Sequence, residues 1–210
     1  MKSFLIRPAL VLALAASLSA CGGSDSDDYT VKGRVAGLVY PGAVLKTNGM
    51  EVKLTPPATP GDDVTFTFPN KLKYGDVYNV VFDPEADNQS CGADSRYIAN
   101  FNDTAGRLAD IEITLACDVD TYGISGKVIG LAADGLVIAN GSNTGRTTIG
   151  KAANNATFDY TMPAVAFGVT YSIVVVQQPT GQTCTVANGT GTMKDAAVTN
   201  VDITCVNNPA

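Results

Sequence analysis

Apolar and polar residues alternate along short segments of this chain. In the first such segment, Val31, Gly33 and Val35 alternate with Lys32 and Arg34, which predicts a strand with one buried and one solvent-facing side. Further runs predict strands at residues 44–47, 52–55, 64–68, 77–82, around Cys91 and at 111–117, then at 124–129, 136–139, 146–149, 157–160, 171–176, 184–188 and 201–205. Asn-Gly pairs and Pro-rich segments separate these runs, and no helical period is sustained after residue 20. We therefore expect an all-β fold.

The second half of the chain repeats the first. Residues 29–38 recur as residues 122–131, an offset of 93 positions. The offset also places Gly75 on Gly168, Tyr78 on Tyr171 and Cys91 on Cys184, while Cys117 and Cys205 match at an offset of 88. A tandem duplication of this kind predicts module 1 at residues 29–120 and module 2 at residues 121–206, with residues 207–210 as a tail.

Each copy has the length and the seven short strands that are typical of an immunoglobulin-like β-sandwich. Both copies also resemble a repeat of bacterial envelope and surface proteins that runs Tyr-x-Val-x-Gly-x-Val-x-Gly-Leu, Phe-x-Phe, Gly-x-x-Tyr-x-Val and Cys-Thr-Val-x-Asn-Gly-x-Gly before Val-Thr-Asn-Val-x-x-x-Cys. The second copy carries these motifs, with residues 158–160 and 198–205 as the second and last, whereas the first copy departs from them at residues 92–97. The resemblance implies the fold and an envelope location, and it supplies no catalytic residue.

Residues 1–20 are typical of an export signal, with a basic start at Lys2 and Arg7 and an apolar run too short to span a membrane. Residues 18–21, Leu-Ser-Ala-Cys, resemble the lipobox of bacterial lipoproteins, in which the Cys thiol accepts diacylglycerol. The resemblance implies cleavage before Cys21 and acyl chains, such as palmitate, on that residue. Because two or three acyl chains hold a protein stably on a bilayer, we expect a lipid anchor at Cys21.

The segment that follows the anchor is short, acidic and rich in Gly and Ser, so we interpret residues 21–28 as a lipidated N-terminus and flexible tether. Gly22 follows the anchor. In lipoproteins of the enteric type, an Asp at that position marks retention in the inner membrane. The resemblance therefore implies a lipid-anchored protein of the cell envelope, placed in the outer membrane.

Composition excludes several functions. The chain has no His and no Trp, which removes Ser-His and Cys-His nucleophile pairs and imidazole metal sites. The formal net charge is -6, and the loss of Lys2 and Arg7 with the signal makes the mature chain more acidic. Because an acidic protein repels phosphates, we expect no nucleic-acid partner. We also expect no cofactor and no enzymatic activity.

The four cysteines other than Cys21 predict disulfides in an exported chain. Three connectivities satisfy four cysteines, and the duplication favours Cys91–Cys117 with Cys184–Cys205 because each module then carries the same bridge. Strand register agrees, because an antiparallel hairpin with Cys184 opposite Cys205 would place Val186 opposite Ile203 and Asn188 opposite Val201, with the bridge on the apolar face. In the first copy, Cys117 shares a face with the apolar residues 111, 113 and 115. The rival interpretation is a four-thiolate zinc site, for which the chain lacks paired Cys-x-x-Cys motifs.

Carboxylates are the remaining candidates for metal chemistry. Asp83, Glu85 and Asp87 alternate along one segment, a spacing that resembles calcium loops, although no Gly stands at the sixth position. The alternative is a solvated acidic loop between strands. Asp118 and Asp120, where the modules join, are a second candidate pair for a cation between modules, as in cadherin-like arrays.

Five aromatic residues are candidate platforms for sugar stacking, with core or strand-end packing as the alternative: Tyr40, Tyr74, Tyr97, Phe101 and Phe167. The function that we expect is a non-catalytic, lipid-anchored envelope protein that acts as a structural or protein-interaction module. Its partners would be the membrane, through Cys21, and an envelope protein or glycan. The alternative is a lipoprotein that binds a glycan or a divalent cation.

Overall fold

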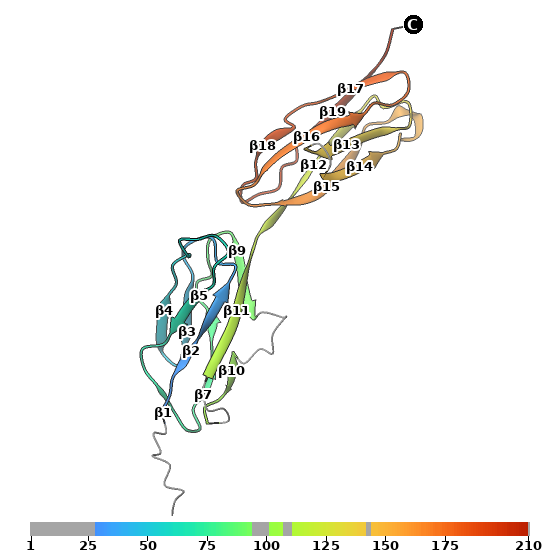
Figure 1. Ribbon diagram of the computed structural model, residues 1–210. Coiled ribbons are helices and arrows are strands. Elements are labelled where there is room, and N and C mark those ends of the chain that lie inside the picture. The colour runs from blue at the N-terminus through green and yellow to red at the C-terminus, as the bar shows by residue number, and fades with distance from the viewer. Residues whose placement is uncertain (1–27, 94–100, 107–110, 142–143, 210) are drawn as a thin grey trace, which may run out of the picture.

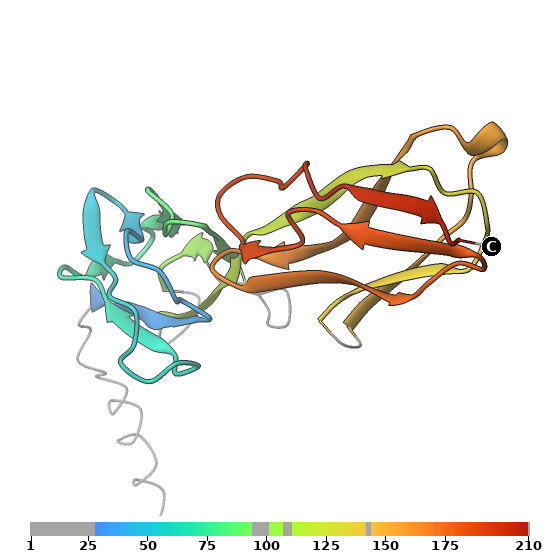
Figure 2. The same cartoon turned by 90° about the horizontal axis from the view of Figure 1, so that it is seen from above.

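The computed structural model describes residues 28–93, 101–106, 111–141 and 144–209. In this part of the chain the fold is all-β, with one 3₁₀ turn, η1 (Ala153–Asn155), as the exception to strands and loops. The predicted all-β class is therefore confirmed. The buried apolar side chains form two separate cores, one from Val31 to Cys117 and one from Ile124 to Cys205. Two groups of strands follow one another along the molecule (Figures 1 and 2).

Module 1 contains four groups of hydrogen-bonded strands around the first core. Its strands are β1 (Asp28–Tyr29), β2 (Val31–Ala36), β3 (Val44–Thr47), β4 (Met50–Lys53), β5 (Val64–Thr67), β6 (Leu72–Lys73), β7 (Val77–Asn79), β8 (Val81–Phe82), β9 (Gln89–Ala93), β10 (Asn102–Thr104) and β11 (Ile111–Val119). The main sheet has the order β5-β2-β11-β9, and the other groups are the sheet β4-β3-β8 and the pairs β10-β7 and β1-β6. Leu45 and Tyr78 from the smaller groups and Ile113 from the main sheet share one core.

Module 2 is a sandwich of two four-stranded sheets. Its strands are β12 (Thr121–Ile129), β13 (Leu136–Asn140), β14 (Thr144–Ile149), β15 (Phe158–Ala166), β16 (Thr170–Gln177), β17 (Gln182–Val186), β18 (Thr190–Thr192) and β19 (Ile203–Asn207). The sheet orders are β15-β12-β19-β17 and β14-β13-β16-β18. Ile124 and Ile203 from the first sheet pack with Ile138 and Ile173 from the second. Burying such side chains is worth about 2 kcal/mol each.

Equivalent glycines, Gly33 and Gly126, lie in the first long strand of each module, at the point where it runs beside the last segment of that module. In module 1, β2 and β11 run in parallel with Gly33 opposite Ile113, and a Cβ atom on Gly33 would lie 2.0 Å from the carbonyl oxygen of Ile113. In module 2, a Cβ on Gly126 would lie 1.9 Å from the carbonyl oxygen of Val201. Only glycine allows the two backbones to approach this closely.

Several strand boundaries differ from those predicted. The predicted strand at residues 52–55 lies at Met50–Lys53, because Asn48 and Gly49 form a two-residue turn with positive φ and the ladder begins at once with Thr47 opposite Met50. The strands β1, β6, β10 and β18 were not predicted. These pieces are two or three residues long, so no apolar period can mark them.

Both predicted disulfides are present. Cys91 lies opposite Cys117 in the β9–β11 ladder, and Cys184 lies opposite Cys205 in the β17–β19 ladder. In module 2 the predicted pairing of Val186 with Ile203 also forms. The expected pair of Asn188 with Val201 does not form, because Asn188 adopts a positive φ and its side-chain amide donates to the carbonyl of Asn200.

Candidate functional site at the module junction

A single residue, Asp120, separates β11 of module 1 from β12 of module 2. Its backbone N–H donates to the carbonyl of Asn88 at 3.0 Å, and its own carbonyl accepts the N–H of Phe167 at 2.9 Å. Its carboxylate accepts the hydroxyl of Ser90 at 2.8 Å. Asn88 and Ser90 belong to module 1 and Phe167 to module 2, so the connecting residue is bonded to both sides. A connection of this kind behaves as a stiff joint rather than as a linker.

Two aromatic rings reinforce the joint. The rings of Tyr40 and Phe167 pack edge to face with centroids 5.2 Å apart and an interplanar angle of 81°. The Tyr40 hydroxyl also donates to the carbonyl of Phe167 at 3.3 Å. Gly168 makes room for this contact, because a Cβ at that position would lie 2.7 Å from the Tyr40 hydroxyl oxygen. Such aromatic pairs contribute about 1 kcal/mol beyond the area that they bury.

Gln89, the first residue of β9, holds the loop that carries Tyr40. The side chain is buried, and its Oε1 accepts the N–H groups of Val39 and Tyr40, both at 2.8 Å. Its Nε2 donates to the carbonyl of Gly37 at 2.8 Å. One amide therefore satisfies three backbone groups of the loop after β2 and fixes the position from which Tyr40 reaches module 2.

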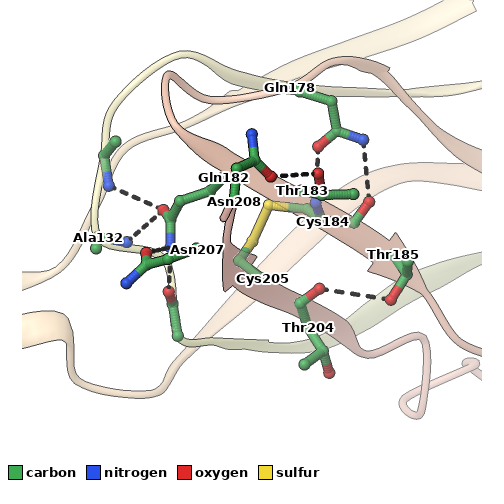
Figure 3. The surroundings of a disulfide bond; sticks show 12 residues. Ala132, Gln178, Gln182, Thr183, Cys184, Thr185, Thr204, Cys205, Asn207 and Asn208 are labelled. Atoms are coloured by element: carbon green, nitrogen blue, oxygen red, sulfur yellow. Dashed lines mark hydrogen bonds between the residues drawn. A yellow bond between two sulfur atoms is a disulfide. The ribbon is translucent and has the colours of Figure 1, made fainter. Parts of the chain in front are cut away.

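The same device occurs in module 2. Gln182 is buried and its Oε1 accepts the N–H groups of Ala132 and Ala133, while its Nε2 donates to Gly130 and to the side chain of Asn207 (Figure 3). Ala133 stands at the position of Tyr40 in the repeat, so this loop carries no ring. Sequence reasoning missed both glutamines, although the repeat offset of 93 connects them.

Two of the three carboxylates proposed for calcium have separate protein partners. Asp83 forms an exposed ion pair with Lys46 at 3.0 Å, and Glu85 accepts the backbone N–H of Cys91 at 3.1 Å. Asp87 is exposed, and its backbone N–H donates to the carbonyl of Pro41 at 2.9 Å. Within the described ranges, no three His, Cys, Asp or Glu side chains gather where a metal ion could bind. Of the second candidate pair, Asp118 is exposed on β11 and Asp120 is bonded to Ser90.

The five aromatic candidates have different positions. Tyr40 and Phe167 face one another in the joint. Phe101 is partly buried against the core of module 1, and Tyr97 lies outside the described residues. Tyr74 is 71% exposed. The structure thus places two of the five in packing contacts between modules, which sequence spacing did not indicate.

Three surface hollows of the described part are lined mainly by Thr, Gly, Asn and aliphatic side chains. The first includes Glu51, another includes Glu112, and the third includes no carboxylate. None of these three hollows brings together the two carboxylates that glycoside hydrolysis uses. No described helix is long and apolar enough to cross a membrane. Cys21 lies outside the described residues.

One ionisable side chain in the core of module 2 has a strongly shifted pKa. Burial raises the pKa of Tyr160 to about 12, and the nearby Asp202 carboxylate acts in the same direction. The neutral hydroxyl donates to the carbonyl of Val201 at 2.7 Å. Phe68 occupies the matching position of the Phe-x-Phe motif in module 1. We therefore interpret Tyr160 as a structural donor.

Comparisons with known proteins add little to this geometry. No protein-family model and no curated protein sequence matches the chain. Among solved structures, the chain is similar to one described as "The Bacillus anthracis TIE protein", with 13% identity and a TM-score of 0.42. The match covers 86% of this chain and 34% of that one, so the chain spans about a third of its length. A likeness at this level says nothing about function.

Proposed function

We propose that the chain is a non-catalytic, lipid-anchored protein of the cell envelope, in which two immunoglobulin-like modules form a stiff structural or protein-interaction element. The observation that carries the proposal is the joint at Asp120, which is bonded to both modules. A flexible linker would let the modules face any direction. A joint with hydrogen bonds and a ring contact across it holds them in one relative orientation, which suits spacing or two-point contact with a partner.

Two further features support an envelope location. Residues 18–21 resemble a lipobox, which gives the chain an anchor at Cys21, and Gly22 favours the outer membrane. Both modules carry a disulfide, and disulfides persist in oxidising compartments such as the periplasm and the cell surface.

The alternative is a lipoprotein that binds a glycan or a divalent cation. The separate partners of Asp83 and Glu85 weigh against a shared cation. The contact between Tyr40 and Phe167 weighs against their use as sugar platforms, because the edge of one ring lies against the other. A calcium titration by calorimetry and a glycan array test this alternative directly, and saturable binding in either would favour it over the structural role.

Two measurements test the proposal. The intact mass of the mature protein from membranes should show acyl chains on Cys21, and Cys21→Ser should abolish them. Residual dipolar couplings of the soluble form lacking residues 1–21 should fit one alignment tensor for both modules. As a control, a variant with the four residues Gly-Ser-Gly-Ser inserted after Asp120 should require two tensors. Two tensors in the unmodified protein would refute the stiff joint, and an unacylated mature chain free in the periplasm would refute the anchor.

A further inference from the structure

A tight turn presents Tyr74 at one end of module 1. The N–H of Asp76 donates to the carbonyl of Lys73 at 3.1 Å, and the Asp76 carboxylate accepts the Lys73 N–H at 2.7 Å. Gly75 has a φ of 87° and donates to the carbonyl of Ala105, whose N–H returns to Asp76. Because these bonds hold the turn on both sides, Tyr74 is displayed from a fixed position.

Module 2 contains the same turn at the repeat offset. The N–H of Val169 donates to the carbonyl of Ala166 at 3.1 Å, and Gly168 has a φ of 77° and donates to the carbonyl of Met193. Phe167 occupies the position of Tyr74, and its ring packs against Tyr40 of module 1. In module 2 this turn is therefore the element that docks.

The matching turn of module 1 is uncovered within the described residues. Tyr74 is 71% exposed and Val77, three residues later, is 70% exposed, the two largest values among the exposed large hydrophobic side chains described. Exposed apolar side chains at one end of a module can mark a contact with a membrane or another protein. We call Tyr74 and Val77 the basal side chains, because β1 and β7 lie at the end of module 1 away from module 2 (Figure 1).

The chain from the anchor enters the fold beside the basal side chains. Strand β1 pairs with β6 so that Asp28 lies opposite Lys73, the residue before Tyr74. Asp28, the first residue of β1, lies seven positions after Cys21, and a fully extended chain of that length reaches at most about 25 Å. An anchor at Cys21 would therefore keep Asp28 within that distance of the bilayer, and the Tyr74 turn lies next to Asp28.

We infer that Tyr74 and Val77 insert into the interface of the membrane that holds the anchor. The inference rests on the proposed lipidation of Cys21. Tyrosine suits this depth, because its ring prefers the apolar side and its hydroxyl stays hydrated. Lys73, beside the turn, is paired with Asp28, and the proposed contact rests on the apolar side chains of Tyr74 and Val77. A contact beside the tether restrains the tilt of module 1, and the stiff joint passes that restraint to module 2.

A second copy of the chain is a less suitable occupant. The docking partner of the equivalent Phe167 is Tyr40, and that ring is already engaged within the molecule. At the corresponding loop of module 2, the repeat has Ala133 instead of a ring.

The absence of tryptophan from the natural chain allows a direct test. Tyr74→Trp introduces a single tryptophan at the base, and Val206→Trp introduces one at a position in module 2 that is 59% exposed. Each acylated full-length mature protein is reconstituted into phosphatidylcholine vesicles whose acyl chains are brominated at a shallow or a deep position. We expect blue-shifted emission and quenching for Tyr74→Trp, stronger with shallow bromines, and neither effect for Val206→Trp. Val77→Trp should behave as Tyr74→Trp does.

Two failures are distinguishable. If the acylated Tyr74→Trp and Val77→Trp proteins show no more quenching of their tryptophan emission than the Val206→Trp control, the membrane contact is overturned and the anchor is left intact. A mature chain without acyl mass on Cys21 would overturn the proposed anchor itself, and the membrane contact with it. Circular dichroism of each variant checks that the fold is retained.

Discussion

Substitution of Gln89 by Ala should loosen the joint between the modules. The side-chain amide of Gln89 makes three hydrogen bonds to the loop that carries Tyr40. Each such bond to a buried backbone group is worth about 1 kcal/mol, so the variant should destabilise module 1 by about 3 kcal/mol. The loop would then lose the constraint that directs Tyr40 toward Phe167, and the orientation of the modules should become variable.

The duplication supplies a matched control for this substitution. Gln182→Ala removes the same type of contact from module 2, where the amide makes four hydrogen bonds and the loop carries Ala133 in place of the ring. Its cost in stability should be similar, about 3 to 4 kcal/mol by the same reasoning. It should leave the joint unchanged, because the loop at Ala133 is the counterpart of the Tyr40 loop and makes no such ring contact.

Residual dipolar couplings of the soluble form measure the difference. One alignment tensor should describe both modules of the natural protein and of Gln182→Ala, whereas Gln89→Ala should need two. Urea unfolding of both variants checks that each module is destabilised but folded under the conditions used. A single tensor for Gln89→Ala, or equal loosening in both variants, would show that Gln89 does not position the joint.

Three further changes have defined outcomes. Since the pKa of Tyr160 is raised from 10.0 to about 12, module 2 should lose on the order of 2 kcal/mol of stability as the pH rises from 10 to 12, because the hydroxyl ionises more readily in the unfolded state, and none of this loss should occur below pH 10. Tyr160→Phe should lower stability by about 1 kcal/mol at pH 8 through the lost hydrogen bond, and should become the more stable protein near pH 12; urea unfolding that shows no crossover would contradict this. Gly126→Ala should lower stability by at least about 2 kcal/mol because its Cβ meets a backbone carbonyl oxygen, whereas Gly123→Ala, with nothing within 4 Å, should not, as thermal melts will show. Replacing Cys184 and Cys205 by Ala opens a loop with a sequence separation of 21 and should lower the stability of module 2 by about 3 kcal/mol, and an unchanged unfolding midpoint would refute the stabilising role.

Local sequence determined the strands that are long enough to show a period. In β11, apolar residues at alternate positions from Ile111 to Cys117 are buried, as the alternation predicts. The same local rule placed each cysteine on an apolar face, and the duplication then connected the cysteines within each module. These features follow from neighbours in the chain, so the sequence alone was sufficient for them.

The joint depended on contacts between distant residues. Tyr40 and Phe167 are 127 positions apart, and nothing near either residue indicates the other. Gln89 and Gln182 belong to a residue type that is usually exposed, and both are buried because each meets the unpaired backbone groups of a loop about 50 positions away. Only the tertiary structure brings each glutamine side chain next to the unpaired backbone groups of the distant loop.

The two copies of the Tyr74 turn show which features follow from local sequence and which depend on tertiary structure. Local sequence gives the same tight turn in both modules, because Gly75 and Gly168 each supply the positive φ that it needs. The surroundings differ, since module 1 lies against the turn of module 2 at Phe167, whereas the described residues leave Tyr74 exposed. Turn geometry is a property of four consecutive residues, but whether an aromatic side chain is covered depends on which part of the chain folds next to it.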